Sequence, residues 1–176
     1  GNIICLMDSD DYFKKNKLTV INKYFLKNIK SNSVFNMPVS DKKKFSHKNK
    51  KTSYSIWPTI FPTSCISAKK KLFLKFIKYL KHNEFQNLEI DARFMIFSKF
   101  FMNENNILNQ KLTVYNEDVF GITSNIRKYS LIWWLRRGEA FQYLKYIISK
   151  KKKEFVISLD SIITSFIYFI IKIFKN

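Results

Sequence analysis

The stretch that decides the fold is Gly1-Asn2-Ile3-Ile4-Cys5-Leu6-Met7-Asp8-Ser9-Asp10-Asp11-Tyr12-Phe13. The residues from Ile3 to Met7 are nearly all apolar and β-prone, which is typical of a strand buried on both faces of a mostly parallel sheet. Three carboxylates follow at the expected end of this strand. Ligands of open α/β sheets bind beyond the carboxyl ends of the strands, where carboxylates can hold a divalent cation that bridges phosphate groups.

Two other interpretations of this acidic cluster must be compared. Aspartates are common in turns after strands and as helix caps, so an ordinary turn stays open. An EF-hand loop counted from Asp8 would place Phe13 at the glycine position and Thr19 at the terminal glutamate position. The sequence therefore excludes an EF-hand. A helix is predicted to follow, with apolar residues at Leu18, Ile21, Phe25 and Ile29.

The residues around the cluster carry a more specific resemblance. Met7-Asp8-Ser9-Asp10-Asp11-Tyr12-Phe13, followed by Lys17-Leu18, resembles the metal-binding Asp-x-Asp strand of family 2 glycosyltransferases with the GT-A fold. The resemblance is strong from Gly1 to about Leu26 and continues to about Tyr143 by order of elements. It implies an α/β fold, with residues 1–149 as the C-terminal part of a GT-A (Rossmann-like) nucleotide-diphospho-sugar transferase domain, followed by helices. The family places a βαβαβ half ahead of this motif, so we expect the chain to be amino-terminally truncated and inactive alone.

The resemblance also implies roles for the acidic residues. Asp10, supported by Asp8, would hold Mn²⁺ or Mg²⁺, and both would bind a nucleotide-diphosphate sugar donor together with Asp11. A helix is predicted to begin near Asp91, because apolar residues recur at helical spacing from Ile90. Related enzymes carry their catalytic base at the start of a comparable helix. Asp91 matches this position best.

Glu89 is the alternative base, because the family's usual Glu-Asp pair is interrupted here by Ile90. An acid in the first turn also complements the helix dipole, so a purely structural Asp91 stays open. The implied reaction transfers a sugar to a glycan or lipid-linked acceptor with inversion at the anomeric carbon. Arg93, Trp133 and Arg136 are candidates for the acceptor side.

Other segments complete the expected organisation. Strands are predicted over 33–39 and 112–115, a basic loop over 41–51, and a helix from Ala68 to about Leu80 capped by Ser67. A further helix has an apolar stripe that we expect to be core, formed by Leu131, Trp134, Phe141, Leu144 and Ile148. Cys5 and Cys65 are too few for a disulfide scaffold and are expected to pack as small hydrophobic residues in a reduced, cytoplasmic protein.

The charge favours an anionic partner. The 176 residues contain 32 Lys and Arg against 13 Asp and Glu, a formal net charge of +19. Lysine dominates, which is more typical of a solvated face or of attraction to anionic lipid headgroups than of sequence-specific nucleic-acid binding. We therefore expect no nucleic acid as partner. A non-catalytic membrane-surface protein is the alternative function, and a nucleic-acid-binding protein a weaker one.

The C-terminal segment 150–176 is expected to be a separate basic and apolar helix. Its apolar stretch from Phe155 to Phe174 would just cross a bilayer, but Asp160 makes a span costly. We expect the helix to lie on the membrane with Lys150 to Lys153 on anionic headgroups, which places the protein on the inner face of the cell membrane as a peripheral protein. The alternative is an amphipathic helix docked on the domain.

Overall fold

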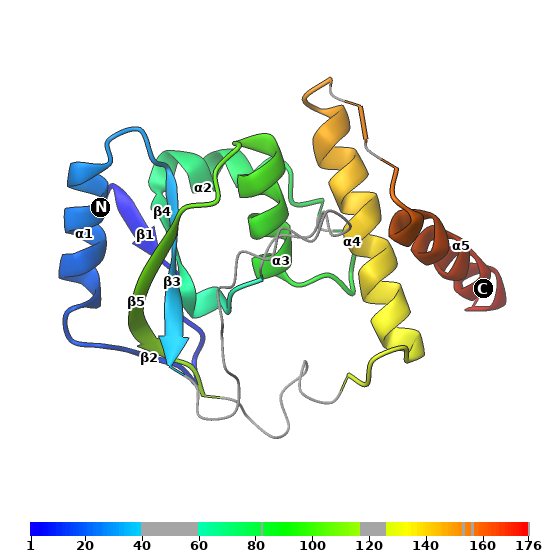
Figure 1. The fold of residues 1–176 in the computed structure, drawn as a ribbon, viewed down its shortest axis with the longest axis horizontal. Helices are drawn as coiled ribbons and strands as arrows, with labels where there is room; N and C mark the ends of the chain where they lie inside the picture. The colour runs from blue at the N-terminus through cyan, green and yellow to red at the C-terminus, as the bar shows by residue number, and fades with distance from the viewer. Residues whose placement is uncertain (40–59, 82, 117–125, 153, 156, 176) are drawn as a thin grey trace.

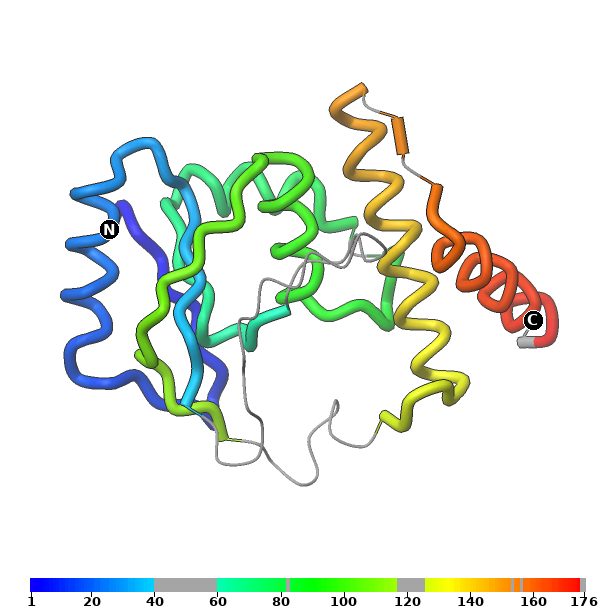
Figure 2. The backbone as a smooth tube through the Cα atoms, in the orientation of Figure 1, coloured from blue at the N-terminus to red at the C-terminus, as the bar shows by residue number. Residues whose placement is uncertain are grey.

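A computed structural model describes residues 1–39, 60–81, 83–116, 126–152, 154–155 and 157–175. The elements form successive layers (Figure 1). Helix α1 (Lys17–Lys27) covers one side of the sheet, and α2 (Lys70–Ile77) and α3 (Ile90–Ile96) cover the other. Helix α4 (Leu131–Ser149) packs beyond α3, and α5 (Leu159–Lys175) is outermost. The two ends of the chain therefore lie at opposite ends of the long axis (Figure 2).

The sheet is mixed, with strand order β1-β4-β3-β5-β2. Its strands are β1 (Ile3–Cys5), β2 (Tyr12–Phe13), β3 (Ser33–Val39), β4 (Ile66–Lys69) and β5 (Ile107–Val114). In the described part of the chain, only β3 and β5 pair in parallel; the other three pairings are antiparallel. The fold class is thus α/β, as predicted, but the expectation of a mostly parallel sheet is wrong.

The apolar run of β1 explains this error. Ile3 and Cys5 pack toward the α1 side of the sheet, and Ile4 and Leu6 pack toward the other side. An apolar run thus reports that both faces of a strand are covered, and it carries no information about strand direction. Among the described residues, β1 pairs with β4 alone. An apolar groove of about 730 Å³ beside it is lined in part by Ile3, Phe25 and Leu74.

Two hydrophobic cores hold the layers together. The smaller one joins α1 to the sheet through Ile21, Phe25, Val34 and Leu112. The larger one is strongly aromatic and centres on Phe94 of α3, whose ring lies 4.9 Å from that of Phe73 and 5.0 Å from that of Phe76. Aromatic pairs at these centroid distances stabilise a core beyond their area burial. The larger core fixes the position of α3, and with it Asp91, against the sheet.

Several predicted elements are confirmed with changed ends. The strand 33–39 is present as predicted, and the later strand begins at Ile107 rather than Leu112. Ser67 lies inside β4 and cannot cap a helix, because the chain stays extended through Lys69 before α2 begins. The strand β2 was not predicted, since two residues are too short to show alternation. The expected loop over 41–51 lies outside the described residues.

The C-terminal helix packs against α4, so it is in contact with the rest of the protein, but its large apolar side chains are exposed and not buried as in an ordinary docked amphipathic helix. The contact is close at Gly138, where a Cβ atom added to the glycine would lie 2.3 Å from Cδ2 of Tyr168 and 2.6 Å from its Cβ. No helix within the described ranges is both long and apolar enough to cross a membrane.

Gly138→Ala is therefore expected to weaken the packing of α5 on α4. Overpacking of this kind costs about 1–3 kcal/mol, and thermal unfolding should report it as a lower Tm. Ala140→Gly on the same helix makes the opposite substitution. It removes a buried methyl group and adds no atom at the α4–α5 contact. An unchanged Tm in Gly138→Ala would mean that the two helices are farther apart in solution.

Candidate functional site

The acidic loop follows β1 and lies against the 3₁₀ turn η1 (Thr63–Cys65). The backbone N–H of Leu6 donates to the carbonyl of Ile66 at 3.0 Å, and that of Asp8 donates to Ser64 Oγ at 2.7 Å. Beyond these bonds, Asp8 and Asp10 are both exposed. The loop is thus held here through its backbone, while both aspartates keep solvent-exposed surface.

Asp11 differs from its two neighbours because it is buried, with 4% of its surface exposed. Its Oδ1 accepts a hydrogen bond of 2.9 Å from the backbone N–H of Asn116, just beyond β5. Its Oδ2 is also buried and has no hydrogen-bond partner in the part of the chain that the structure describes. Asp11, predicted to bind the donor, therefore also ties the acidic loop to the end of β5, a role that sequence reasoning missed.

The carboxylates of the loop repel one another. The pKa of Asp8 is raised, first by partial burial and then by the negative charges of Asp11 and Asp10, against a lowering hydrogen bond from Thr63. A cation placed beside these groups would offset the repulsion and favour the charged forms. The electrostatics of the loop therefore suit a positive ligand.

Asp91 lies in the first turn of α3 and is electrostatically coupled to the acidic loop. Its Oδ1 accepts a 2.6 Å hydrogen bond from the backbone N–H of Ala92. Burial, with a smaller contribution from the charge of Asp8 and against the lowering hydrogen bond from Ala92, raises the pKa of Asp91 to about 6. The structure thus brings together two acids that are 83 positions apart in the sequence, Asp8 and Asp91 (91 − 8).

Glu89, the alternative base, has a different environment. It directly precedes α3 and forms an ion pair with the guanidinium of Arg136 on α4. Arg136 Nε also donates to the carbonyl of Asn87 at 3.1 Å. Within the described residues Asp91 has no such ion-pair partner. The geometry therefore favours Asp91 over Glu89 as a proton acceptor, and it gives Arg136 a role in pinning the start of α3.

Arg93 lies in the interior instead of on an acceptor-facing surface. Only 8% of it is exposed, and its guanidinium donates to three backbone carbonyls. The bonds from Nε to Leu88 and from Nη1 to Leu80 measure 2.9 and 2.8 Å, and Nη2 donates to Phe85. Arg93 thus holds the loop before α3 in place. The acceptor contact of Arg93 stays a prediction, and the structure gives this side chain a structural role that the sequence did not indicate.

Trp133 is half-buried near the start of α4, which Ser130 caps by accepting a 3.3 Å hydrogen bond from the Trp133 backbone N–H. Its ring lies 4.7 Å from Trp134 and 5.2 Å from Tyr129. The guanidinium of Arg137 lies 5.2 Å above it. Trp134 is also only half-buried, whereas Leu135 of the same turn is buried. The core stripe of α4 is thus shifted by one residue at this end.

Lys17 is the group at this site that sequence reasoning missed. It is fully buried at the start of α1, where its Nζ donates to the carbonyl of Ser64 and, at 2.9 Å, to Thr113 Oγ1. The same Nζ lies 3.7 Å from the centre of the Phe13 ring. Burial lowers the pKa of Lys17 to about 8. Its only signal in the sequence was its place in the motif, since a lysine on an amphipathic helix is normally expected in solvent.

Cys65, next to Ser64, is buried, and burial raises the pKa of its thiol to about 12. A thiol with so high a pKa stays protonated and unreactive at neutral pH. Its packing as a small hydrophobic residue is therefore as predicted.

The acidic loop suits a metal ion that is shared with a phosphate-bearing substrate, and not one that is enclosed by protein ligands alone. The described residues contain no group of three or more His, Cys, Asp or Glu side chains that could enclose an ion. Mg²⁺ and similar ions usually keep several waters and bind through one or two carboxylates plus the phosphates of a substrate. The exposed Asp8 and Asp10 fit this second mode.

The comparisons with known proteins add no relative to this picture: no family model, no curated protein and no solved structure matches the chain.

Proposed function

We propose that this chain carries the metal and acceptor side of a nucleotide-diphospho-sugar transferase similar to family 2 glycosyltransferases. The observation that carries the proposal is the pairing of two kinds of acid at one place: the exposed Asp8 and Asp10, and Asp91 with its pKa raised to about 6. A carboxyl group whose pKa is raised by burial and by a neighbouring carboxylate is a candidate for acid–base chemistry. The donor is a nucleotide-diphosphate sugar, and the acceptor a glycan or a lipid-linked molecule.

The residues have separate tasks in this reaction. Asp10 and Asp8 would hold Mn²⁺ or Mg²⁺, which, when bound, offsets the charge of the diphosphate and of the departing nucleotide. Asp91 receives the proton of the acceptor hydroxyl at Oδ2, because its Oδ1 is engaged by Ala92. With a pKa near 6, the carboxylate is ready to accept this proton at pH 7.

The stereochemistry follows from a single displacement. The acceptor oxygen attacks the anomeric carbon on the face opposite the leaving diphosphate, so the configuration inverts. A lipid-linked acceptor would place this reaction at the cytoplasmic face of a membrane, with the protein bound peripherally.

Binding of Mn²⁺ in the presence of inorganic pyrophosphate tests the metal site without requiring a nucleotide-binding half. The wild-type chain is expected to bind the complex, and Asp10→Asn to lose at least about tenfold in affinity, because it removes one of two carboxylates. Electron paramagnetic resonance of Mn²⁺ measures this directly.

Glu84→Gln is the matched control, since it removes an exposed carboxylate whose partner is Lys81 on the surface. Equal affinity in Asp10→Asn and Glu84→Gln would contradict the proposed metal site.

A further inference from the structure

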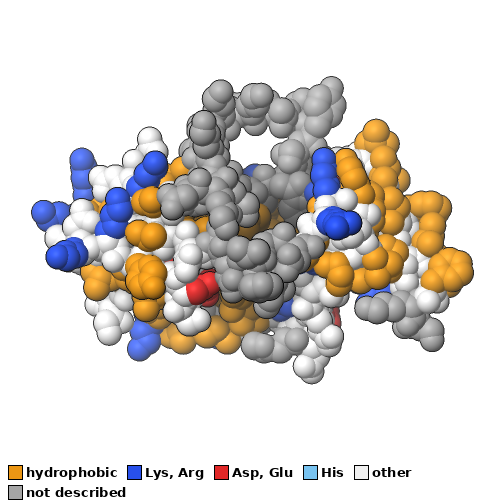
Figure 3. All heavy atoms as spheres, turned by 90° about the horizontal axis from the view of Figure 1, so that it is seen from below, with side chains coloured by type: hydrophobic (Ala, Val, Ile, Leu, Met, Phe, Trp, Pro, Cys, Tyr) orange, Lys and Arg blue, Asp and Glu red, His pale blue; other side chains and the backbone are white. Residues whose placement is uncertain are grey.

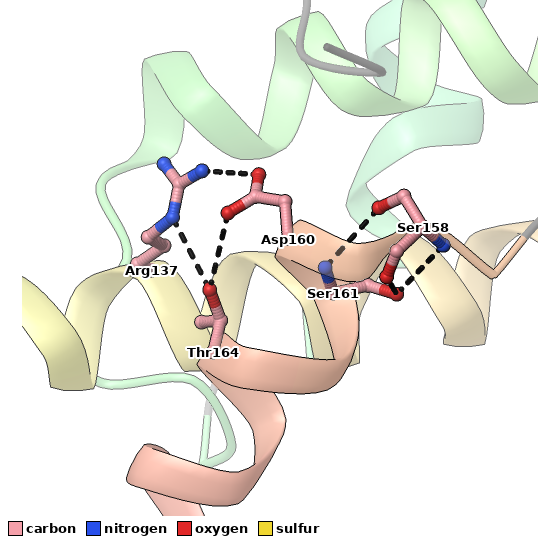
Figure 4. Close-up of polar contacts among 5 residues, drawn as sticks. All are labelled: Arg137, Ser158, Asp160, Ser161 and Thr164. Carbon is pink, nitrogen blue, oxygen red and sulfur yellow. Dashed lines mark hydrogen bonds and ion pairs between the residues drawn. The ribbon is translucent and has the colours of Figure 1, made fainter. Parts of the chain in front are cut away.

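Helix α5 turns its polar side toward the protein. Ser161 and Thr164 are buried on α4, with 3% and 0% of their surface exposed. The guanidinium of Arg137 forms an ion pair with Asp160, and its Nε donates to Thr164 Oγ1 at 3.3 Å (Figure 4). At the start of the helix, the backbone N–H of Ser161 donates to Ser158 Oγ at 3.1 Å. The helix is thus capped at its start, and these polar contacts hold it on α4 together with the packing of Tyr168 against Gly138.

The outward side of α5 is apolar. Its large side chains recur at helical spacing and are exposed: Leu159, Ile162, Ile163, Phe166, Phe169, Ile170, Ile173 and Phe174. The exposed fraction is 64% for Phe166, 63% for Phe169 and 86% for Phe174. We call these eight residues the outer face of α5. In Figure 3, hydrophobic side chains cover the end of the molecule where α4 and α5 lie, with Lys or Arg side chains beside them.

The orientation of α5 is opposite to that of a helix that stabilises a water-soluble domain. A surface helix normally packs its apolar stripe on the core and exposes its polar one. Scattered exposed hydrophobic residues need no explanation, but a continuous apolar face indicates an interaction site. The outer face of α5 therefore needs an occupant.

We propose that the outer face of α5 inserts into the surface of a bilayer that contains anionic lipids. Charge favours this occupant, because the chain has a formal net charge of +19 and the only carboxylate on α5, Asp160, is paired with Arg137. Lys172 lies at the border of the outer face, and Lys150 and Lys152 are exposed in the preceding turn. Lysines in such positions reach lipid headgroups while the apolar side chains enter the acyl region.

The same charge disfavours a second copy of the chain as the occupant. Two protomers that met through the outer face would bring two net charges of +19 together, and their repulsion opposes association. A bilayer with anionic headgroups instead turns this charge into attraction. The inference stands on α5 and the charge, independently of sugar transfer.

Co-sedimentation with vesicles tests the proposal. The wild-type chain is expected to sediment with vesicles of phosphatidylcholine mixed with phosphatidylserine, less with phosphatidylcholine alone, and less as salt increases. The double variant Phe166→Ser and Phe169→Ser keeps the charge and removes two exposed rings. It is expected to lose at least about tenfold in apparent partition coefficient.

Leu18→Ser with Leu26→Ser is the matched control, because both leucines are exposed on α1, at the opposite end of the molecule (Figure 1). Its partition coefficient should stay close to that of the wild type. Circular dichroism of all three proteins establishes that the helices are intact.

Three results would overturn the proposal. Wild-type protein that does not sediment with either kind of vesicle is the first, and equal losses in the two double variants are the second. The third is light scattering that shows a wild-type dimer which the Phe166 and Phe169 variant dissociates, without vesicle binding; the occupant would then be a second copy.

Discussion

Asp91→Asn is expected to make the protein more stable at neutral pH. In the folded state the pKa of Asp91 is raised from 3.8 to about 6, so the folded state binds its proton more tightly than the unfolded state does. The stability contributed by this proton is fully present below pH 3.8 and is lost as the pH rises through 6. At pH 7 the buried charge should cost about 2–3 kcal/mol, a cost that the neutral amide avoids. The amide oxygen can still accept the hydrogen bond from Ala92.

Urea unfolding at two pH values measures this effect. The variant should be more stable than the wild type at pH about 7.5 and close to it at pH about 4, where Asp91 is mostly protonated in the folded state. Glu84→Gln on the surface should show no comparable gain. If the variant were equally or less stable than the wild type at the higher pH, the charged Asp91 carboxylate would not destabilise the folded state.

The same variant should remove the proton acceptor of the proposed reaction. Loss of a general base typically lowers the rate by about 10²–10⁴-fold. In the active transferase, kcat should fall by this factor, and the wild-type rate should rise with pH to a plateau above about pH 6. Greater stability together with lost turnover would mark Asp91 as a functional residue; wild-type turnover in Asp91→Asn would assign it a structural role only.

Arg93→Leu is expected to show the largest loss of stability. It leaves the buried carbonyls of Leu80 and Leu88 without the Arg93 donor, and the Phe85 carbonyl keeps only its bond from the Leu88 backbone N–H. Each buried acceptor left unsatisfied costs about 1–3 kcal/mol, so a loss of about 3–5 kcal/mol is expected in urea unfolding. Because this loop leads directly into α3, the substitution should also displace Asp91.

Arg93→Lys is the informative comparison, since it keeps the charge but lacks the planar fork that reaches several acceptors at once. Its stability should lie between those of the wild type and Arg93→Leu. If Arg93→Leu were as stable as the wild type while lacking transfer activity, the acceptor contact predicted from the sequence would be the better explanation.

Local patterns were enough to predict several elements. Apolar spacing predicted α1, where Ile21 and Phe25 are buried, and the start of α3 near Asp91. It did not separate these residues from Leu18, which is exposed on the same helix, or from Ile29, which is exposed beyond the end of α1 at Lys27. Periodicity identifies a face of a helix, whereas the width of the buried part depends on what packs against it.

The environments of the polar residues could not be predicted in this way. Lys17 and Arg93 are buried because Ser64, Thr113 and the carbonyls of a preceding loop supply their hydrogen bonds. These partners come from segments distant in the sequence or from irregular backbone, which local spacing does not describe. Glu89 and Asp91 are only two positions apart, yet the pairing of Glu89 with Arg136 on α4 gives them different environments.

The sequence by itself determined the α/β class, the order of most elements, the acidic loop after the first strand and the amphipathic character of the C-terminal helix. These features depend on residue type and spacing within a few turns of chain. Only the tertiary structure decided that the sheet is mixed, that Asp8 and Asp91 lie close enough to interact, and that α5 turns its polar side inward. Such features depend on which surfaces pack together, because burial, hydrogen bonds and charge interactions between distant segments arise only when the chain has folded.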